Sequence, residues 1–156
     1  MKVPVIIEKG KDAFWGRVEG HEFLPVTVGN SAQEVLDNLK MLIADYIEHE
    51  GQDDKVWKNV DVNKIAFSLH FDLRAFFDEY DFLNISAIAA MAGINQSLLR
   101  QYAKGLKFPS INQAKKVEKT IHELAKKMNK VSLVESGMVE LVQKDKSRLL
   151  ETKTYS

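Results

Sequence analysis

Residues 85–102 read ISAIAAMAGINQSLLRQY. With residue 85 as the first position, a small residue, Ala89, stands fifth and a glycine, Gly93, stands ninth. Apolar residues fill the fourth, tenth, fifteenth and eighteenth positions, which are Ile88, Ile94, Leu99 and Tyr102. Two helices that cross at close range need a small side chain at the contact, and a three-residue turn needs a left-handed residue, which glycine adopts without strain. The spacing therefore predicts two short helices, 85–92 and 96–103, on a shared apolar core.

This spacing is typical of a helix-turn-helix, in which residues 96–103 form the recognition helix. Asn84 is placed to cap the first helix, and Ser110 is placed to cap a long last helix over residues 111–129. The whole stretch 85–110 is similar to the lambda-repressor-like, or xenobiotic-response-element, helix-turn-helix family, including that family's closing G-x-x-x-P-S. The alternative for these residues is a plain helical bundle with a glycine corner.

The candidate DNA-binding residues follow from how such a helix docks. Its N-terminal turn enters the major groove, where glutamine reads adenine and arginine reads guanine, while lysines suit phosphate contacts. The residues expected at this interface are Asn95, Gln96, Ser97, Arg100, Gln101, Lys104 and Lys107. For each of them a solvated surface position is the alternative. One recognition helix reads few base pairs, so we expect a homodimer or higher homo-oligomer on a double-stranded DNA operator.

The first part of the chain has the patterns of strands and one helix. β-branched and aromatic residues predict strands at 3–8, 13–19, 23–28 and 65–71. Ser31 and Glu34 form a capping box at the start of a helix. That helix has an apolar stripe made of Val35, Leu36, Leu39, Leu42, Ile43, Tyr46 and Ile47. The β-β-β-α-β order predicts an antiparallel sheet under one helix, so the expected fold class is α+β, with an all-α helix-turn-helix domain after it.

The charges are unevenly distributed although the 156 residues carry no net charge. Residues 1–83 hold 9 basic and 16 acidic side chains, a net charge of −7, and residues 84–130 hold 9 basic and 2 acidic, a net charge of +7. Such asymmetry suggests that the basic part meets a polyanion, although two solvated surfaces of chance composition are the alternative. We expect domains at 1–71 and 72–130, with a C-terminal extension at 131–156 that is either a strand added to a partner or a loose extension.

Several function classes lack support in the sequence. The chain has no cysteine, which excludes thiolate chemistry and is consistent with a cytoplasmic protein. No apolar run suits a membrane span or a signal peptide, so no membrane partner is expected. The four histidines are scattered, there is no glycine-rich phosphate loop, and Glu8, Asp12, Glu19 and Glu22 lack the spacing of a metal cluster. We therefore expect no enzyme activity, no catalytic residue, no metal and no cofactor.

The two parts together resemble the HicB-type antitoxins of type II toxin-antitoxin systems. The stretches that carry the resemblance are VPVIIEK at 3–9, AFWGRVE at 13–19 and residues 27–35, TVGNSAQEV, which is similar to the family's T-x-G-[DN]-[ST]-x-x-E-A with Val35 in place of the alanine. The resemblance implies a partial ribonuclease-H-like domain that binds and inhibits a small basic ribonuclease toxin, and a dimeric DNA-binding domain that represses its own operon. The alternatives are a stand-alone regulator whose first domain senses a ligand or dimerises, and a nuclease.

Overall fold

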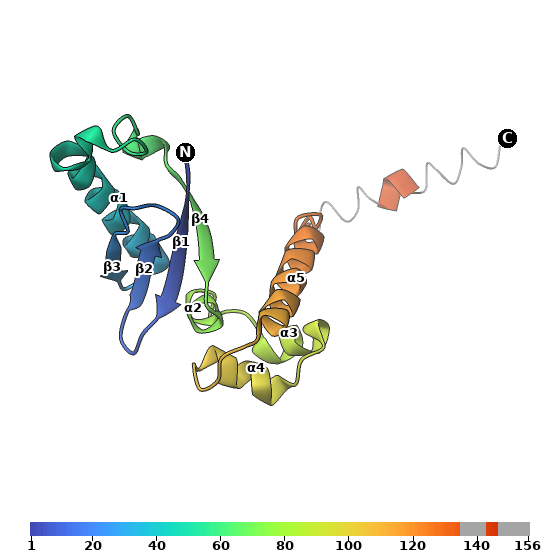
Figure 1. Cartoon of the computed structure of the whole chain (residues 1–156). Helices are drawn as coiled ribbons and strands as arrows, with labels where there is room; N and C mark the ends of the chain where they lie inside the picture. Colours follow the sequence, from blue (N-terminus) through green and yellow to red (C-terminus); the bar gives the residue numbers. More distant parts are fainter. Residues whose placement is uncertain (135–142, 147–156) are drawn as a thin grey trace. The chain divides into compact units, whose positions relative to one another are not determined.

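The computed structural model describes residues 1–134 and 143–146 (Figure 1). Its main elements are β1 (Lys2–Lys9), β2 (Phe14–Val18), β3 (Val26–Gly29), α1 (Ala32–His49), β4 (Ala66–Phe71), α2 (Leu73–Glu79), α3 (Ile85–Ala92), α4 (Gln96–Ala103) and α5 (Ile111–Met128). The fold class is α+β, and the first five elements follow the expected β-β-β-α-β order. Of the apolar tail residues, Val131 and Leu133 are exposed, whereas Val139, Leu141 and Val142 lie outside the described residues.

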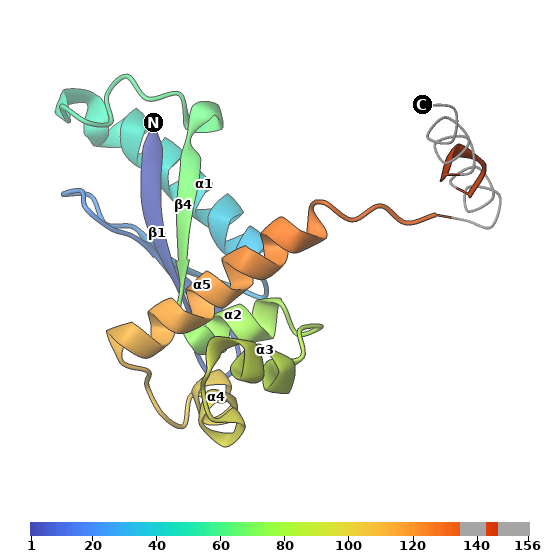
Figure 2. The ribbon, with the colours of Figure 1, turned by 90° about the vertical axis from the view of Figure 1, so that its right-hand side faces the viewer.

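The four strands form one mixed sheet in the order β3-β2-β1-β4. β1 pairs antiparallel with β2, and β2 pairs antiparallel with β3, but β1 pairs parallel with β4. β1 and β4 run side by side in both views (Figures 1 and 2). The expectation of an antiparallel sheet is therefore wrong at one edge. The reason is the helix between β3 and β4, because a helical crossover lets the chain re-enter the sheet in the direction of β1.

The core lies between one face of the sheet and α1. Alternate β1 residues, Val3, Val5 and Ile7, have no exposed surface, and the predicted helix stripe supplies the buried Val35, Leu39 and Ile43. Leu42 belongs to the same predicted stripe but is 39% exposed, so the stripe that packs on the sheet is narrower than expected. The buried residues of β1 and α1 form one hydrophobic cluster. Burial of apolar side chains of this size is the main favourable term in folding.

The β3–α1 junction explains the TVGNSAQEV motif by local bonding. Ser31 Oγ accepts a hydrogen bond from the Glu34 backbone N–H at 3.1 Å, and Glu34 Oε2 accepts one from the Asn30 N–H at 2.8 Å. A Cβ added at Gly29 would lie 2.9 Å from the Val35 nitrogen, so the close turn requires glycine. The predicted capping box is thus present, with Asn30 rather than the cap residue itself as the second donor.

Two departures from the sequence patterns lie next to α1. Strand β3 begins at Val26 rather than at residue 23, and the Phe23 ring instead stacks on Tyr46 with centroids 3.8 Å apart. The connection after α1 reads as polar, yet it contains the fully buried Trp57 and two short 3-10 turns, Gly51–Asp53 and Val62–Lys64. The connection is therefore a packed part of the domain.

Internal contacts divide the chain into two units, Met1–Thr120 and Ile121–Ser156. Within the first unit, α2 packs on both β1 and α4. Lys9 Nζ lies 3.0 Å from Asp78 Oδ2, and the Ala32 N–H donates to Glu79 Oε2 at 3.2 Å, so α2 is bonded to β1 and to the start of α1. The predicted boundaries at 71/72 and 130/131 stay predictions. In the described part of the chain, no helix is both long and apolar enough to cross a membrane.

Candidate nucleic-acid interface

Helices α3 and α4 have the bounds that the sequence predicts, and three residues connect them. Gly93 adopts a left-handed conformation with φ of +68°, and the Ile94 N–H donates to the Ala89 carbonyl at 2.9 Å. Asn84 Oδ1 caps α3 by accepting from the Ala87 N–H at 3.0 Å, and Asn95 Oδ1 caps α4 by accepting from the Leu98 N–H at 3.2 Å. Gly93 and Asn84 therefore perform the local roles expected of them, whereas Asn95, expected at the DNA interface, also caps α4.

The two helices share the predicted apolar core. The small and apolar residues singled out from the spacing, as distinct from Gly93, are all buried, and they are Ile88, Ala89, Ile94, Leu99 and Tyr102. Helix α4 also packs against α2, so a third helix supports it. The polar residues Gln96, Ser97 and Arg100 of α4 are exposed. Buried apolar residues and an exposed polar side make α4 a rigid platform for side chains that face outward.

The predicted DNA-binding residues separate into exposed and partly buried positions. Six of them are exposed on or beside α4, and these are Asn95, Gln96, Ser97, Arg100, Lys104 and Lys107. Gln101 is half-buried, and its backbone carbonyl accepts from the N–H groups of Leu106 and Lys107 at 2.9 and 3.4 Å. The side chain of Asn95 is also used as a helix cap. Gln96, Ser97 and Arg100 are thus the best-placed groups for base contacts.

One contact at this surface has no signal in the sequence pattern. The Arg100 guanidinium donates a hydrogen bond to Ser86 Oγ, which lies in the first turn of α3. The two residues are fourteen positions apart, so helical periodicity within one element does not connect them. The bond orients the arginine from a neighbouring helix, and an oriented guanidinium is suited to bidentate recognition.

Basic residues predominate in α4 and in the part of the first unit that follows it in the chain. Residues 84–120 include Arg100 and five lysines against a single acidic residue, Glu118. Helix α5 begins at Ile111, with Ser110 Oγ accepting from the Gln113 N–H at 3.2 Å, and it exposes Lys115 and Lys116. A positive surface beside an outward-facing helix is the electrostatic pattern of a nucleic-acid-binding site.

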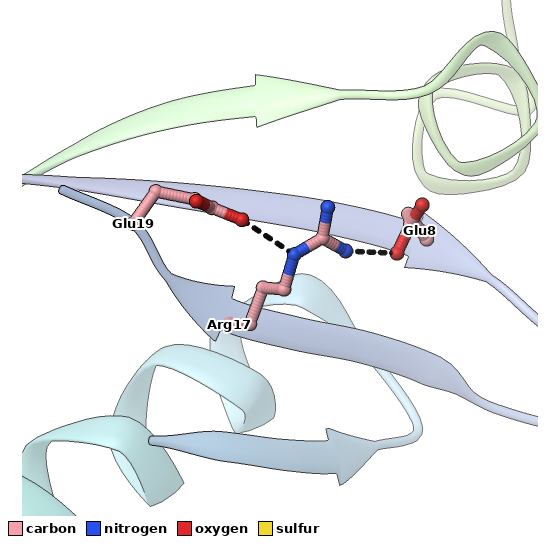
Figure 3. A network of polar contacts seen from close by, with 3 residues as sticks. All are labelled: Glu8, Arg17 and Glu19. Carbon is pink, nitrogen blue, oxygen red and sulfur yellow. Dashed lines mark hydrogen bonds and ion pairs between the residues drawn. The ribbon is translucent and has the colours of Figure 1, made fainter. Parts of the chain in front are cut away.

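The acidic part of the chain has its own open surface, on the sheet face that α1 does not cover. Arg17 on β2 bonds to Glu8 of β1 and, through Nε at 2.6 Å, to Glu19 Oε1 (Figure 3). These bonds, first of all the one to Glu19, raise the pKa of Arg17 above its usual value. Beside this cluster, Trp15 is 49% exposed and pairs with Val28, which is 41% exposed. The face therefore combines a small net negative charge with apolar side chains.

A hollow of about 830 Å³ lies at the end of the same domain. Tyr46 and Trp57 contribute to its wall, with five carboxylates from Glu19, Glu22, Glu50, Asp53 and Asp54. Tyr46 Oη donates to Asp54 Oδ2 at 2.9 Å, and the N–H of Val56 donates to Asp54 Oδ1 at 2.7 Å. Hydrogen bonding, chiefly from Val56, lowers the pKa of Asp54. Within residues 1–134 and 143–146, no three acidic or histidine side chains are grouped so as to hold a metal ion.

No protein-family model, curated protein or solved structure matches this chain. What can be said of its class therefore comes from the geometry described above and from the sequence motifs. The geometry gives an α+β protein with a mixed four-stranded sheet and, in the same unit, a capped helix pair that exposes Gln96, Ser97 and Arg100.

Proposed function

We propose that the chain is an antitoxin of the HicB type, which represses its own operon through α3 and α4 and neutralises a small basic ribonuclease through residues 1–71. The observation that supports it most is the α3–Gly93–α4 geometry, with buried apolar positions and an exposed row of Gln96, Ser97 and Arg100. Short capped helices around a left-handed glycine are the frame of a helix-turn-helix, which presents its second helix to the major groove.

In the DNA complex, Gln96 is the proposed adenine reader and Arg100 the proposed guanine reader. Lys104 and Lys107, exposed just after α4, are assigned to phosphate contacts that fix register without reading sequence. Helix α4 has eight residues, so one copy covers a half-site and two copies are required for an operator.

For the toxin, the support is the charge and the architecture of the first part of the chain. Residues 1–83 have a net charge of −7, which attracts a basic ribonuclease and raises its association rate. The β-β-β-α-β order, with β4 parallel to β1, supports the partial ribonuclease-H-like assignment of residues 1–71. The sheet face around Trp15 and Arg17 is open to a partner within the described residues.

The experiment that tests the toxin partner is co-expression of the full chain with any small basic protein encoded next to its gene. We expect the full chain to capture that product and to suppress its cleavage of RNA. Because toxin binding is assigned to residues 1–71, Arg100→Ala is the matched control, and it should capture the product as well as wild type does. Failure of both proteins to capture any product, with operator binding intact, would remove the antitoxin assignment.

The second candidate is a stand-alone regulator whose first domain senses a ligand, and the hollow beside Tyr46 and Trp57 favours it. Its carboxylates would select a cationic compound. The two functions differ in a simple test, since a regulator of this kind binds operator DNA without a protein partner and changes its affinity when a cationic ligand is added. An antitoxin changes its DNA affinity when the toxin is added.

A further inference from the structure

The two outer strands of the sheet differ in how their free edges are protected. β3, at one edge, has four residues and follows Pro25, and its Val28 carbonyl accepts a hydrogen bond from Asn38 Nδ2 of α1 at 2.9 Å. Short length, a proline and cover from a helix are ways in which proteins keep a sheet edge from pairing with another chain. The edge at β3 is therefore closed to a further strand.

β4, at the other edge, lacks both proline and charge. Its six residues read AFSLHF, although 28% of the residues in the chain are charged. Figure 1 shows β4 as the last strand of the sheet, and within the described residues β1 is the only strand that pairs with it. Charged residues, above all lysine, are a common protection of an edge strand, so β4 is open to pairing with a further strand.

The backbone groups on the free side of β4 belong to alternate residues. The N–H groups of Ala66 and Asp72 both donate to carbonyls of the β1 side at 3.0 Å, so the even-numbered residues of β4 bond toward β1. In a parallel pair, the residues between them direct their N–H and C=O groups to the opposite side. Phe67, Leu69 and Phe71 therefore present these groups at the free edge.

We propose that β4 pairs antiparallel with β4 of a second copy of this chain, so that the two sheets join into one. A two-fold axis beside Leu69 places Leu69 opposite its own counterpart, and Phe67 opposite Phe71 of the second copy. In this register all three outward-directed residues find a partner. Each facing pair exchanges both of its N–H···O=C hydrogen bonds, and such main-chain bonds provide the affinity of strand addition.

The side chains match in the same register. Phe67, Leu69 and Phe71 are aligned with β1 residues whose side chains are buried toward α1, so they form an apolar row on that face of the sheet. Across the axis this row meets its own copy, and Leu69, which is 40% exposed, stands at the centre. On the other face, Ser68 lies opposite His70 of the second copy, so polar side chains meet polar side chains. The edge is therefore complementary to itself.

Charge and closure both favour a second copy as the occupant. β4 carries no charge, so two copies meet there without repulsion, whereas a strand of a basic partner would find no carboxylate in β4 to attract it. Because the opposite edge is closed at β3, this pairing ends at two copies. The contact belongs to the sheet and requires no DNA, so it is independent of the proposed function.

Sedimentation of the full chain without DNA, over a range of concentrations, tests the pairing. We expect wild type to self-associate reversibly. Leu69→Lys should raise the dissociation constant of this step at least about tenfold, because two lysines would face each other across the axis. The matched control is Val26→Lys, at a 54% exposed position of β3, which should leave the equilibrium unchanged. A wild-type chain that stays monomeric, or self-association that Leu69→Lys leaves unchanged, would overturn the proposal.

A second measurement does not depend on the stability of a lysine variant. The chain has no cysteine, so Leu69→Cys introduces a single thiol. Opposed residues of a hydrogen-bonded antiparallel pair have Cα atoms about 5.5 Å apart, which a disulfide can span. Mild oxidation should link Leu69→Cys into a covalent dimer rapidly, whereas Phe67→Cys and Val26→Cys, whose thiols lie away from the axis, should not be linked. Equal cross-linking of the three variants would contradict the proposed pairing.

Discussion

Gly93 connects α3 to α4 in a left-handed conformation with φ of +68°, and nothing lies within 4 Å of a Cβ placed there. The only penalty for a side chain is therefore backbone strain. We expect Gly93→Ala to lower the free energy of unfolding by about 1 kcal/mol. Gly93→Asn should cost less, because asparagine tolerates this region. Chemical denaturation of both variants measures the difference, and an alanine variant as stable as the asparagine variant would contradict the turn geometry.

Gly16 on β2 is required for a different reason, since a Cβ there would lie 2.1 Å from Val35 Cγ1 of α1. Gly16→Ala should destabilise the fold by about 1–3 kcal/mol through overpacking. Val35→Ala removes the clashing methyl group, so the same glycine substitution made in a Val35→Ala background should cost far less. Denaturation of the two single variants and the double variant gives the coupling. An equal cost in both backgrounds would show that the clash is absent.

Sequence reasoning at the residue scale succeeded where one residue type performs one local task. The caps at Asn84 and Ser110, the glycine at 93 and the exposure of Gln96 and Arg100 all follow from short-range rules. The bond from Arg100 to Ser86 does not, because it depends on how α3 crosses α4. The role of Gly16 was missed for the same reason, as it depends on the distance between the sheet and α1.

Among the elements, the connection between α1 and β4 holds the clearest pH-sensitive feature. Asp54 accepts from Tyr46 Oη and from the N–H groups of Val56 and Trp57. Bonding of the charged carboxylate, chiefly by Val56, lowers the pKa of Asp54 below 3.8, so its contribution to stability is present above that pH and is lost as pH falls through the folded-state pKa.

We therefore expect Asp54→Asn to melt at a lower temperature than wild type at pH 7 and the gap between them to narrow as the pH falls below about 3.8. Circular dichroism melts over that pH range measure the gap. Asp53→Asn is the control, since Asp53 is an exposed neighbour, and its gap should be small throughout. A gap that widens toward acid pH would reverse the assigned sign.

The elements themselves were largely predictable, whereas their arrangement was not. Periodicity and caps gave the bounds of α3 and α4, but the parallel β1–β4 pair depends on the crossover after β3. Strand β3 starts late because Phe23 stacks on Tyr46, a contact between segments 23 residues apart. Trp57 sits among polar residues, so its burial has no periodic signal.

At the scale of the whole molecule, the −7 and +7 parts of the sequence correspond to the sheet-bearing segment and the helical segment. The charge division was readable from the sequence because it needs only counting. The exposure of Leu106, Phe108 and Ile111 was not readable, because these are residue types of a core and only the fold leaves them exposed. Under the proposed function, the acidic part binds a basic toxin and the basic part binds DNA. Both the toxin affinity and the DNA affinity should therefore weaken as the salt concentration increases.

The measurement that tests the central claim most directly is a fluorescence anisotropy titration of the full chain with the DNA upstream of its own gene, against a shuffled duplex of equal length. We expect tighter binding to the upstream DNA, with a log–log salt slope that reflects several phosphate contacts at about 0.9 per contact. Arg100→Ala should lose about 1–3 kcal/mol of binding free energy on the upstream DNA and little on the shuffled duplex. Equal affinity for both duplexes, unchanged by Arg100→Ala, would contradict sequence reading by α4.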